Sequence, residues 1–446
     1  MRTRDAIGLG RPSVLIPRAG VDLAKWAVIA CDQFTSEPEY WKQVEDLVGQ
    51  APSTLNLIYP EVYLSEPDPD VRIRRIRESM KRYLAEGLFQ EKEGFTYVER
   101  QVGRRTRRGF LACLDLERYD YNRGSTSLVR ATEGTILERI PPRVRIREGA
   151  PLELPHIMIL IDDPEDTVIG PLEAAKSGHE KLYDFELMMG SGRLAGYRVK
   201  DPGLEEGLTR ALAHLGDPAV FARRYGLAPG TPVLLYAMGD GNHSLATAKA
   251  IWEKTKSAAG SGGPVMAGPL RYALVEIVNL YDPALVFEPI HRVVFGVEPA
   301  SALADALAAR FGDGVSLREA ASFEAMKKEV EGQSGLPQKI GLVAGEGTRI
   351  IEVSRTDFVL PVGTLQAFLD AFLAEKRAKS VDYVHGSDAV LTLGRKPGNA
   401  GLFLPALPKT DLFKTVILNG ALPRKTFSMG EAREKRFYLE ARKLFE

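Results

Sequence analysis

The segment Val233–Trp252 constrains the fold more than any other part of the chain. An apolar run, Val233–Met238, ends in the polar, glycine-containing stretch Gly239–Ser244, and an apolar helical pattern follows over Leu245–Trp252. This order predicts a buried strand, a loop and a helix. Such a loop points several backbone N–H groups and the positive end of the helix dipole at one place, which suits an anion such as phosphate.

The side chains of this loop add chemistry at the same place. A carboxylate, an amide, an imidazole and a hydroxyl stand close together on Asp240, Asn242, His243 and Ser244. One interpretation is a phosphate or nucleotide site with a general acid or base. The other is a helix N-cap, in which Asn242 or Ser244 caps the helix and His243 bonds a main-chain carbonyl. Because the loop matches neither the Walker nor the Rossmann fingerprint, its spacing leaves both interpretations open.

A second candidate group, Arg130, Glu133 and Thr135, follows a predicted strand. A guanidinium can grip a carboxylate or phosphate with two hydrogen bonds, and Glu133 can serve as a base or hold a cation. The alternative is an ordinary salt bridge at the end of a strand.

Two further candidates lie in the second half of the chain. His291 and Arg292 follow a proline and either face a ligand or consist of a core histidine beside an exposed arginine. Lys425 lies between an arginine and a threonine, in a loop that either binds an anion or is simply solvated.

The length of 446 residues exceeds what one hydrophobic core usually supports, so more than one structural unit is expected. Short strands alternate with helices in the first part, which predicts a mixed α/β core. From about residue 298 alanine-rich helical patterns dominate. We therefore expect an α/β core with an N-terminal elaboration over 1–297 and a smaller α+β portion over 298–446.

Charge and cysteine content indicate which partners and which cellular location to expect. Lys plus Arg and Asp plus Glu both number 59, which disfavours a nucleic-acid partner and gives no reason to expect a membrane surface. The two cysteines stand far apart in no metal-binding spacing, as in a reducing compartment. With neither a secretory signal nor a long apolar run, the expected location is the cytoplasm.

Several smaller features predict local structure. Lys25–Cys31 is predicted as a strand, and Pro155–Ile161 as a buried strand that makes His156 structural. Ser257–Gly268 is the best candidate for a mobile loop or lid. Glu431–Phe445 has the pattern of a charged closing helix.

Taken together, these segments resemble the bacterial and archaeal family called domain of unknown function 1015 over nearly the whole chain. The matching stretches include ACDQFTSEPEYW, GDGNHSLATAKA, VNLYDPALVFEPIHR and LPRKTFSMGEAREKRFYLEARK. The strand–loop–helix is in turn similar to the Asp-Gly-His-His-Arg element of the wider ParB/sulfiredoxin-like superfamily, which includes free-serine kinases. Two positions depart from that element: Asn242 replaces its first His, and Ser244 replaces its Arg.

The resemblance implies a small-molecule phosphotransferase, or another enzyme that uses a nucleotide or phosphate. In that picture Asp240 positions Mg²⁺ or the acceptor, His243 or Glu133 is the general base, and Arg130 and Arg292 stabilise the transferring charge. The implied ligand is a small phosphorylated molecule or nucleotide, with Mg²⁺ and a nucleotide or pyrophosphate as possible cofactors. The remaining predicted ligand-binding residues are Gly239, Gly241, Asn242, Ser244, Thr135, His291 and Lys425.

Two alternatives stay open. One is a non-catalytic, nucleotide-sensing or partition-type regulator, and a basic DNA-contacting helix would favour it. The other is a hydrolase or isomerase that uses Glu133 and His243 on a phosphorylated metabolite.

Overall fold

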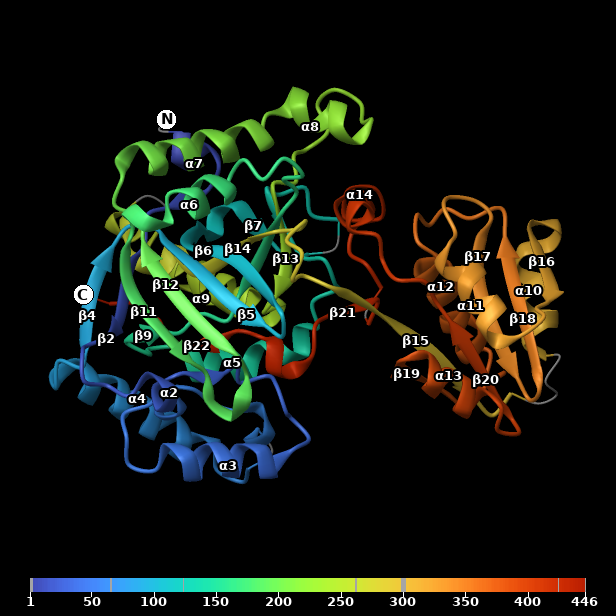
Figure 1. Ribbon diagram of the computed structural model, residues 1–446, viewed down its shortest axis with the longest axis horizontal. Helices are drawn as coiled ribbons and strands as arrows, with labels where there is room; N and C mark the ends of the chain where they lie inside the picture. The colour runs from blue at the N-terminus through green and yellow to red at the C-terminus, as the bar shows by residue number, and fades with distance from the viewer. Residues whose placement is uncertain are drawn as a thin grey trace. The chain divides into compact units, whose positions relative to one another are not determined.

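The computed structural model describes residues 3–64, 66–122, 124–260, 263–297, 302–423 and 425–445. The chain divides into two compact units (Figure 1). Unit 1 comprises Met1–Leu285 and Glu431–Glu446, and unit 2 comprises Val286–Gly430. The sequence-based division at 297/298 remains a prediction about domains, but the packing differs from it at the C-terminus, because the final segment returns to unit 1.

Unit 1 is built around a mixed sheet. Its strands, in spatial order, are β11 (Glu180–Glu186), β12 (Arg193–Arg198), β5 (Thr96–Val102), β6 (Arg105–Asp115), β14 (Tyr272–Asn279), β10 (Met158–Ile161), β13 (Tyr236–Asp240), β8 (Val129–Arg130) and β7 (Tyr119–Asp120), with β1 (Leu9–Gly10) paired to β6. The β10–β14, β13–β8 and β7–β8 pairs are parallel, and the others are antiparallel.

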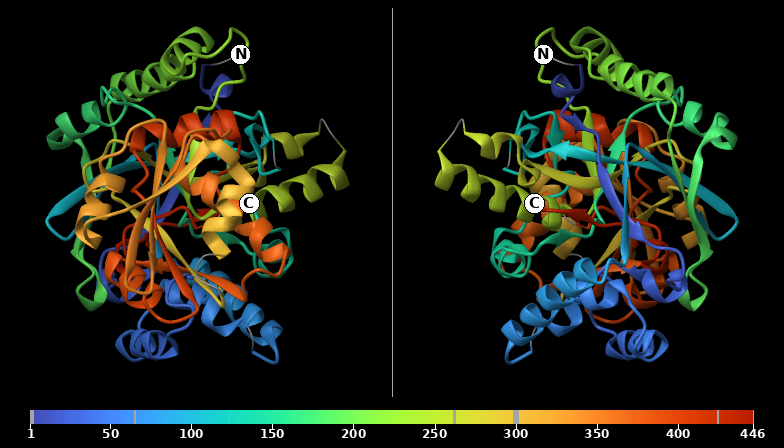
Figure 2. Two further views of the ribbon diagram at one scale, coloured as in Figure 1. Left: turned by 90° about the vertical axis from the view of Figure 1, so that its right-hand side faces the viewer. Right: turned by 90° about the vertical axis from the view of Figure 1, so that its left-hand side faces the viewer.

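Helices surround this sheet. They are α1 (Thr3–Ala6), α2 (Leu23–Trp26), α3 (Pro38–Val48), α4 (Pro69–Ala85), α5 (Ile140–Arg147), α6 (Gly170–Ala174), α7 (Pro202–Leu215), α8 (Pro218–Tyr225) and α9 (Asn242–Ala259). Figures 1 and 2 place α3 and α4 together at one end of unit 1 and α7 at the opposite end. No described helix combines the length and the apolar character that a membrane span requires.

Three two-stranded sheets complete unit 1. They pair β2 (Ser13–Pro17) with β4 (Phe89–Glu93), β3 (Val28–Ile29) with β22 (Phe437–Tyr438), and β9 (Leu152–Glu153) with β23 (Arg442–Lys443). Two of the three therefore include a strand from the C-terminal segment, which ties the end of the chain to the first third.

Unit 2 is an antiparallel sheet with helices. Its strands, in spatial order, are β16 (Val315–Glu319), β18 (Gly347–Val353), β17 (Gln338–Ala344), β20 (Asn399–Phe403), β15 (Phe287–Phe295) and β19 (Ser380–His385), with β21 (Phe427–Met429) paired to β15. The helices are α10 (Ala302–Phe311), α11 (Phe323–Glu331), α12 (Pro361–Ala374), α13 (Ser387–Gly394) and α14 (Lys409–Asn419). The mixed α/β fold class predicted from the sequence is confirmed.

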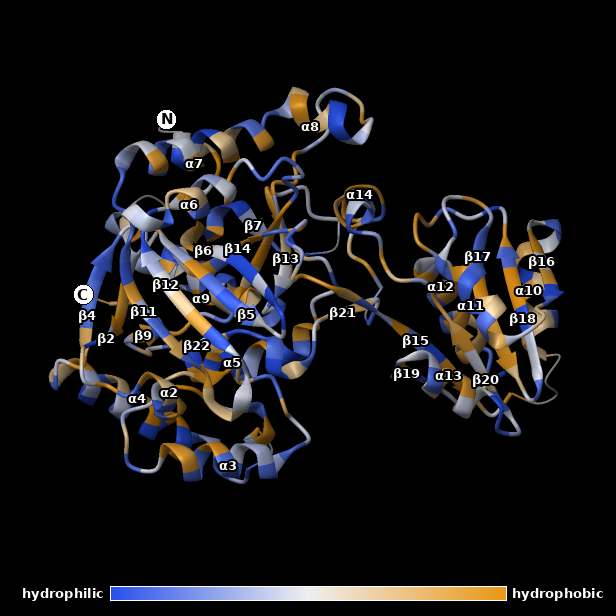
Figure 3. Cartoon of the chain, viewed as in Figure 1, coloured by the Kyte–Doolittle hydropathy of each residue, from blue (hydrophilic) through white to orange (hydrophobic). Residues whose placement is uncertain are grey.

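Hydropathy explains which residues of the strands and helices are buried. All four residues of β10 are buried, as expected for a short apolar run in the middle of a sheet. Along α3 hydrophobic and hydrophilic residues alternate (Figure 3), and its buried residues recur at helical spacing: Tyr40, Trp41, Val44 and Val48.

Two local predictions were wrong. Lys25–Cys31 is not one strand: the Asp22 carboxylate accepts hydrogen bonds from the N–H groups of the following residues and opens α2, so that the strand shrinks to β3. Glu431–Phe445 is not a helix but a 3-10 turn followed by β22 and β23, because strand partners from the first third are available. The predicted lid, Ser257–Gly268, contains residues 261–262, which lie outside the described residues.

Candidate functional site

The sheet order explains why distant segments meet at the end of β13. The antiparallel neighbour β10 pairs Met158 with Asp240, so the residues that precede β10 lie beside the loop that follows β13. The parallel neighbour β8 pairs Arg130 with Ala237, so the chain after β8 runs on alongside the same loop. The loop therefore has a neighbouring segment on either side.

Gly241 makes the turn from β13 into α9 possible. Its φ of 74° lies in the left-handed region, and a Cβ there would come within 2.9 Å of the Cα atom of Ile157. The position thus needs glycine both for its backbone conformation and for the close approach of the segment before β10.

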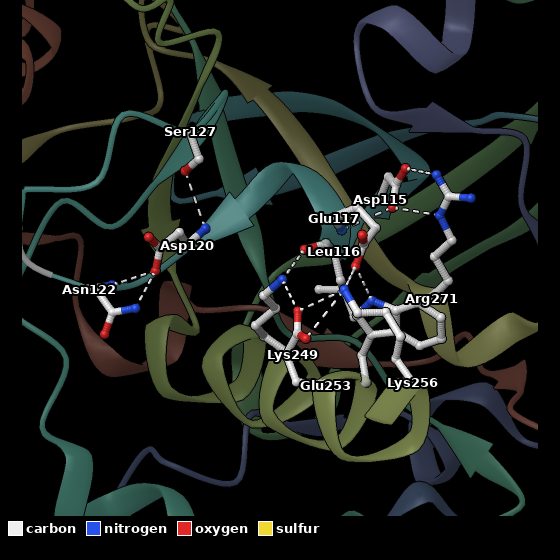
Figure 4. A network of polar contacts seen from close by, with 11 residues as sticks. Asp115, Leu116, Glu117, Asp120, Asn122, Ser127, Lys249, Glu253, Lys256 and Arg271 are labelled. Carbon is white, nitrogen blue, oxygen red and sulfur yellow. Dashed lines mark hydrogen bonds and ion pairs between the residues drawn. The ribbon is translucent and has the colours of Figure 1, made fainter. Parts of the chain in front are cut away.

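A polar network holds α9 along the face that carries Lys249, Trp252 and Lys256 (Figure 4). Lys249 Nζ donates to the carbonyl of Leu116 (2.9 Å), while Trp252 Nε1 and Lys256 Nζ bond the carboxylate of Glu117 (2.6 and 2.7 Å). With buried apolar residues on another face, these contacts hold the helix axis, and with it the direction in which its N-terminus points.

Asp240 is paired with a lysine from the C-terminal segment. Lys435 Nζ lies 3.2 Å from Asp240 Oδ2, and both side chains are mostly buried. Burial acts to raise the pKa of Asp240, but the Lys435 ammonium and the nearby His156 outweigh it and hold the pKa below its usual value. Asp240 is therefore an anion that faces a cation at the start of α9.

His156 links the loop to the C-terminal segment in another way. Its Nε2 lies 3.0 Å from Ser244 Oγ, and its Nδ1 lies 2.7 Å from the hydroxyl of Tyr438. The carboxylate of Asp32, which follows β3, lies 3.7 Å from the same Nε2. One ring nitrogen of a histidine predicted as structural thus lies near both a serine hydroxyl and a carboxylate.

Asn242 and His243 contact the segment that follows β8. Asn242 Nδ2 donates to the carbonyl of Glu133 (3.1 Å) and to Thr135 Oγ1 (3.4 Å), and the Ile136 N–H donates to His243 Nε2 (3.4 Å). Burial lowers the pKa of His243 to about 4, and two nearby arginines of the 139–143 region reinforce the shift. His243 is therefore neutral near pH 7.

A cavity of about 140 Å³ lies against the first turns of α9. Its polar side includes Ser244, His156 and Tyr438, together with an ion pair of Arg143 and Glu61. Its other walls are mainly apolar, among them Leu57, Ile58, Leu64, Ile76, Met80 and Ile146. The cavity can receive a compact apolar group beside a serine and an imidazole.

Arg130 has its guanidinium occupied by the main chain. Nε donates to the carbonyl of Ser127, and Nη2 donates to that of Pro232, both at 2.8 Å. These bonds tie the segment around β8 to the residues that precede β13, so the Arg130 guanidinium has a structural role here.

His291, Arg292 and Lys425 belong to unit 2, and each takes part in a hydrogen bond within that unit. The Leu404 N–H donates to His291 Nδ1 (3.1 Å), and the buried Arg292 donates to the carbonyl of Lys425 (2.9 Å). Arg292 is not the exposed arginine considered from the sequence, since its side chain is fully buried. These contacts are internal to unit 2; Lys425 contributes only its main-chain carbonyl, and its side chain is exposed.

The loop residues Asp240, Asn242, His243 and Ser244 are thus brought together with Glu133 and Thr135. Sequence reasoning missed Lys435, and it assigned His156 a structural role. One signal was available: Lys435 and Tyr438 lie in the stretch LPRKTFSMGEAREKRFYLEARK, which carries part of the family resemblance. The separation of 191 or more residues between these positions and the segment Gly239–Ser244 gave no local pattern to detect.

The described side chains suggest no preformed metal centre. Among them, no group of three or more His, Cys, Asp or Glu residues is arranged to hold a metal ion. Mg²⁺ commonly binds through one or two carboxylates together with substrate phosphates, and Asp240 can supply one such carboxylate.

Comparisons with solved structures gave distant matches. A free serine kinase in complex with AMP is 10% identical, with a TM-score of 0.37, covering 75% of this chain and 92% of that one. SbnI with a C-terminal truncation, from Staphylococcus aureus, is 9% identical, with a TM-score of 0.34, covering 72% and 82%. A conserved hypothetical protein from Pyrococcus furiosus is 12% identical, with a TM-score of 0.31, covering 72% and 92%. At these scores the likeness carries no functional argument.

A search of curated proteins found no match. By contrast, the family model described as a protein of unknown function, DUF1015, matches residues 15–372, which is more than half of the chain. The chain therefore belongs to the DUF1015 family.

Proposed function

We propose that unit 1 carries a small-molecule phosphotransferase whose phosphate site is the segment Gly239–Ser244, which the sequence predicted as a loop and which comprises the end of β13, Gly241 and the first turn of α9. The observation that carries the proposal is the Lys435–Asp240 pair at 3.2 Å, because it supplies a cation at the start of α9. The loop of the wider superfamily that this one resembles has an arginine where this chain has Ser244. Lys435 provides a positive charge at this loop from another segment.

The backbone adds to this charge. The N-terminus of an 18-residue helix presents N–H groups and a partial positive charge, and α9 begins directly after Gly241. A phosphate held there would meet the ammonium of Lys435 and the first N–H groups of the helix. Together these groups would neutralise charge on a transferring phosphoryl group.

Asp240 and Glu133 have the remaining proposed roles. Asp240, an anion at neutral pH, would orient the acceptor or hold Mg²⁺, which would supply charge neutralisation on the phosphate oxygens. His243 Nε2 already accepts from the Ile136 N–H, so Glu133 is the proposed base toward an acceptor hydroxyl.

A thermal-shift screen tests the proposal. The probes are inorganic phosphate, pyrophosphate, ADP, ATP and small phosphorylated metabolites, each with and without Mg²⁺. A ligand present at 100 times its Kd stabilises the folded state by about 2.7 kcal/mol, which such a screen detects readily. We expect at least one phosphorylated probe to raise the Tm, and phosphoryl transfer to be measurable with that probe.

Lys435→Ala should abolish this shift, while the matched control Lys254→Ala should preserve it because Lys254 is an exposed residue farther along α9. The proposal fails if no phosphorylated probe raises the Tm, or if both variants respond equally. Binding without any turnover would contradict the phosphotransferase and favour a non-catalytic, nucleotide-sensing regulator.

A further inference from the structure

Ser244 and His156 form a hydrogen-bonded pair, with His156 Nε2 3.0 Å from Ser244 Oγ. The hydroxyl of Tyr438 lies 2.7 Å from His156 Nδ1 and 3.1 Å from Cys31 Sγ, so its oxygen can accept a proton from Nδ1. In the tautomer with the proton on Nδ1, His156 Nε2 carries the lone pair and accepts from the Ser244 hydroxyl. This is the arrangement of a hydroxyl beside its general base.

The surroundings stabilise the charges that such a pair would develop. The carboxylate of Asp32 lies 3.7 Å from His156 Nε2, and the ring of His156 packs against Gly241 next to the anionic Asp240. An imidazolium formed on His156 would therefore face two carboxylates. Ser244 lies in the first turn of α9, where the helix dipole favours negative charge.

The pair also borders a place for a reactant. Ser244, His156 and Tyr438 all line the cavity of about 140 Å³, as do the ion pairs Arg143–Glu61 and Arg147–Glu153, and its remaining walls are mainly apolar. This volume is small beside the roughly 300–1,000 Å³ of sites for drug-sized ligands. It suits a phosphate ester or anhydride with a compact apolar body.

We propose that Ser244 is a nucleophile activated by His156, and that the enzyme forms a phosphoseryl intermediate from a compact, apolar phosphorylated donor. The inference rests on the proposed phosphotransferase function and adds the route of transfer. It predicts a double displacement, in which donor and acceptor react in turn at Ser244.

Each half of the reaction balances. In the first, Ser244 Oγ forms a bond to phosphorus, the bond from phosphorus to the donor oxygen breaks so that the donor leaves as an oxyanion, and the serine proton passes to His156 Nε2. In the second, the acceptor oxygen bonds phosphorus, the bond to Ser244 breaks, and His156 returns its proton to Oγ. The proton of the acceptor hydroxyl goes to the proposed base, Glu133.

Diisopropyl fluorophosphate tests the nucleophile without knowledge of the donor, because it phosphorylates an activated serine with loss of fluoride. The full chain is labelled, and the modified peptides are quantified by mass spectrometry. Ser387, which opens α13 in unit 2, is the internal control. We expect Ser244 to be labelled about 100- to 10,000-fold faster than Ser387, the range of general-base catalysis.

Two variants examine the pair. His156→Gln should slow labelling of Ser244 by a similar factor and leave Ser387 unchanged. Tyr438→Phe removes a positioning residue, so it should lower the rate constant of labelling without changing the reagent concentration that gives half the maximal rate. Far-UV circular dichroism checks that each variant is folded, and the comparison of Ser244 with Ser387 in the unmodified protein needs no variant.

Equal labelling of Ser244 and Ser387 in the folded wild-type protein overturns the inference. So does phosphoryl transfer that continues unchanged in Ser244→Ala with a donor found in the thermal-shift screen. Either result leaves the proposed phosphotransferase standing if that screen is positive. Failure of the screen removes the proposed function instead, so the two failures can be told apart.

Discussion

The chain contains two strand–glycine–helix segments that look alike locally but have different surroundings. In unit 1, β13 leads through Gly241 into α9, and in unit 2, β19 leads through Gly386 into α13; both glycines have positive φ, 74° and 80°. Both carry a histidine and a serine close to the glycine. However, β13 lies between two strands of its sheet, whereas β19 is an edge strand.

The difference lies in what contacts each glycine. A Cβ added at Gly241 would meet the segment before β10, while one at Gly386 would meet open space. His385 and Gly386 are exposed, whereas the loop at Gly241 receives contacts from His156, Lys435 and the segment after β8. The strand–glycine–helix pattern therefore forms a candidate site only where distant segments contact it. Substitutions made in pairs, one in each unit, test this difference.

The largest effect is expected from Arg436→Met, which releases the C-terminal segment. Arg436 is buried and paired with Glu276 and with Glu440 (2.6 Å), both buried as well. Removing one partner of such a network typically costs about 3–5 kcal/mol. Urea unfolding should show this loss of stability, while Arg395→Met, which breaks an exposed pair with Glu346, should cost about 0–1 kcal/mol. Similar losses in both variants would contradict the anchoring role of Arg436.

Gly241→Ala and Gly386→Ala compare the two glycines directly. At Gly241 (φ 74°, ψ 28°) alanine adds the strain of the left-handed region, about 1–2 kcal/mol, and at Gly386 (φ 80°, ψ 143°) it enters a region nearly confined to glycine, at about 1–3 kcal/mol. Only at Gly241 does the new Cβ also meet backbone, which adds about 1–3 kcal/mol of overpacking. We expect the free energy of unfolding to fall by clearly more for Gly241→Ala. Equal losses would mean that the loop yields to its neighbours.

The low pKa of His243 predicts that the free energy of unfolding depends on pH. The unfolded state of His243 takes up its proton near pH 6.5, but the folded state does so near pH 4, because burial opposes the charge. Stability should therefore fall by about 1–2 kcal/mol as the pH drops from 6.5 to 4, since solvent screens part of the charge on this partly exposed ring. Replacing His243 by Asn should flatten the curve of unfolding free energy against pH over this range. An unchanged slope would contradict the assignment.

The smallest effect is expected from Asn242→Ala. The substitution removes hydrogen bonds to the carbonyl of Glu133 (3.1 Å) and to Thr135 (3.4 Å), worth about 1 kcal/mol in total. Thermal or urea unfolding measures it against Asp388→Ala, at an exposed position of α13 that should change stability by less than about 0.5 kcal/mol. A loss below that of the control would show that the contact contributes nothing.

Much of the fold could be predicted from local pattern. The apolar run before Gly239, the hairpin of β5 and β6, and the helix opened by Asp68 follow from hydrophobic periodicity, turn residues and a capping carboxylate. The C-terminal segment could not be predicted in the same way. Its charged residues fit a solvated helix, and the buried partners that make it extended, Glu276 and Glu153, are more than a hundred residues away.

By itself, the sequence determined the strand–loop–helix at 233–252, because glycine, apolar periodicity and helix propensity act over neighbouring residues. Tertiary structure decided which residues surround that loop. The antiparallel register of β10 brings His156 to Ser244, and buried ion pairs hold the C-terminal segment so that Lys435 reaches Asp240. Long-range ion pairs and strand register depend on where the whole chain goes, and for that reason the cation at this loop was found in the structure and not in the sequence.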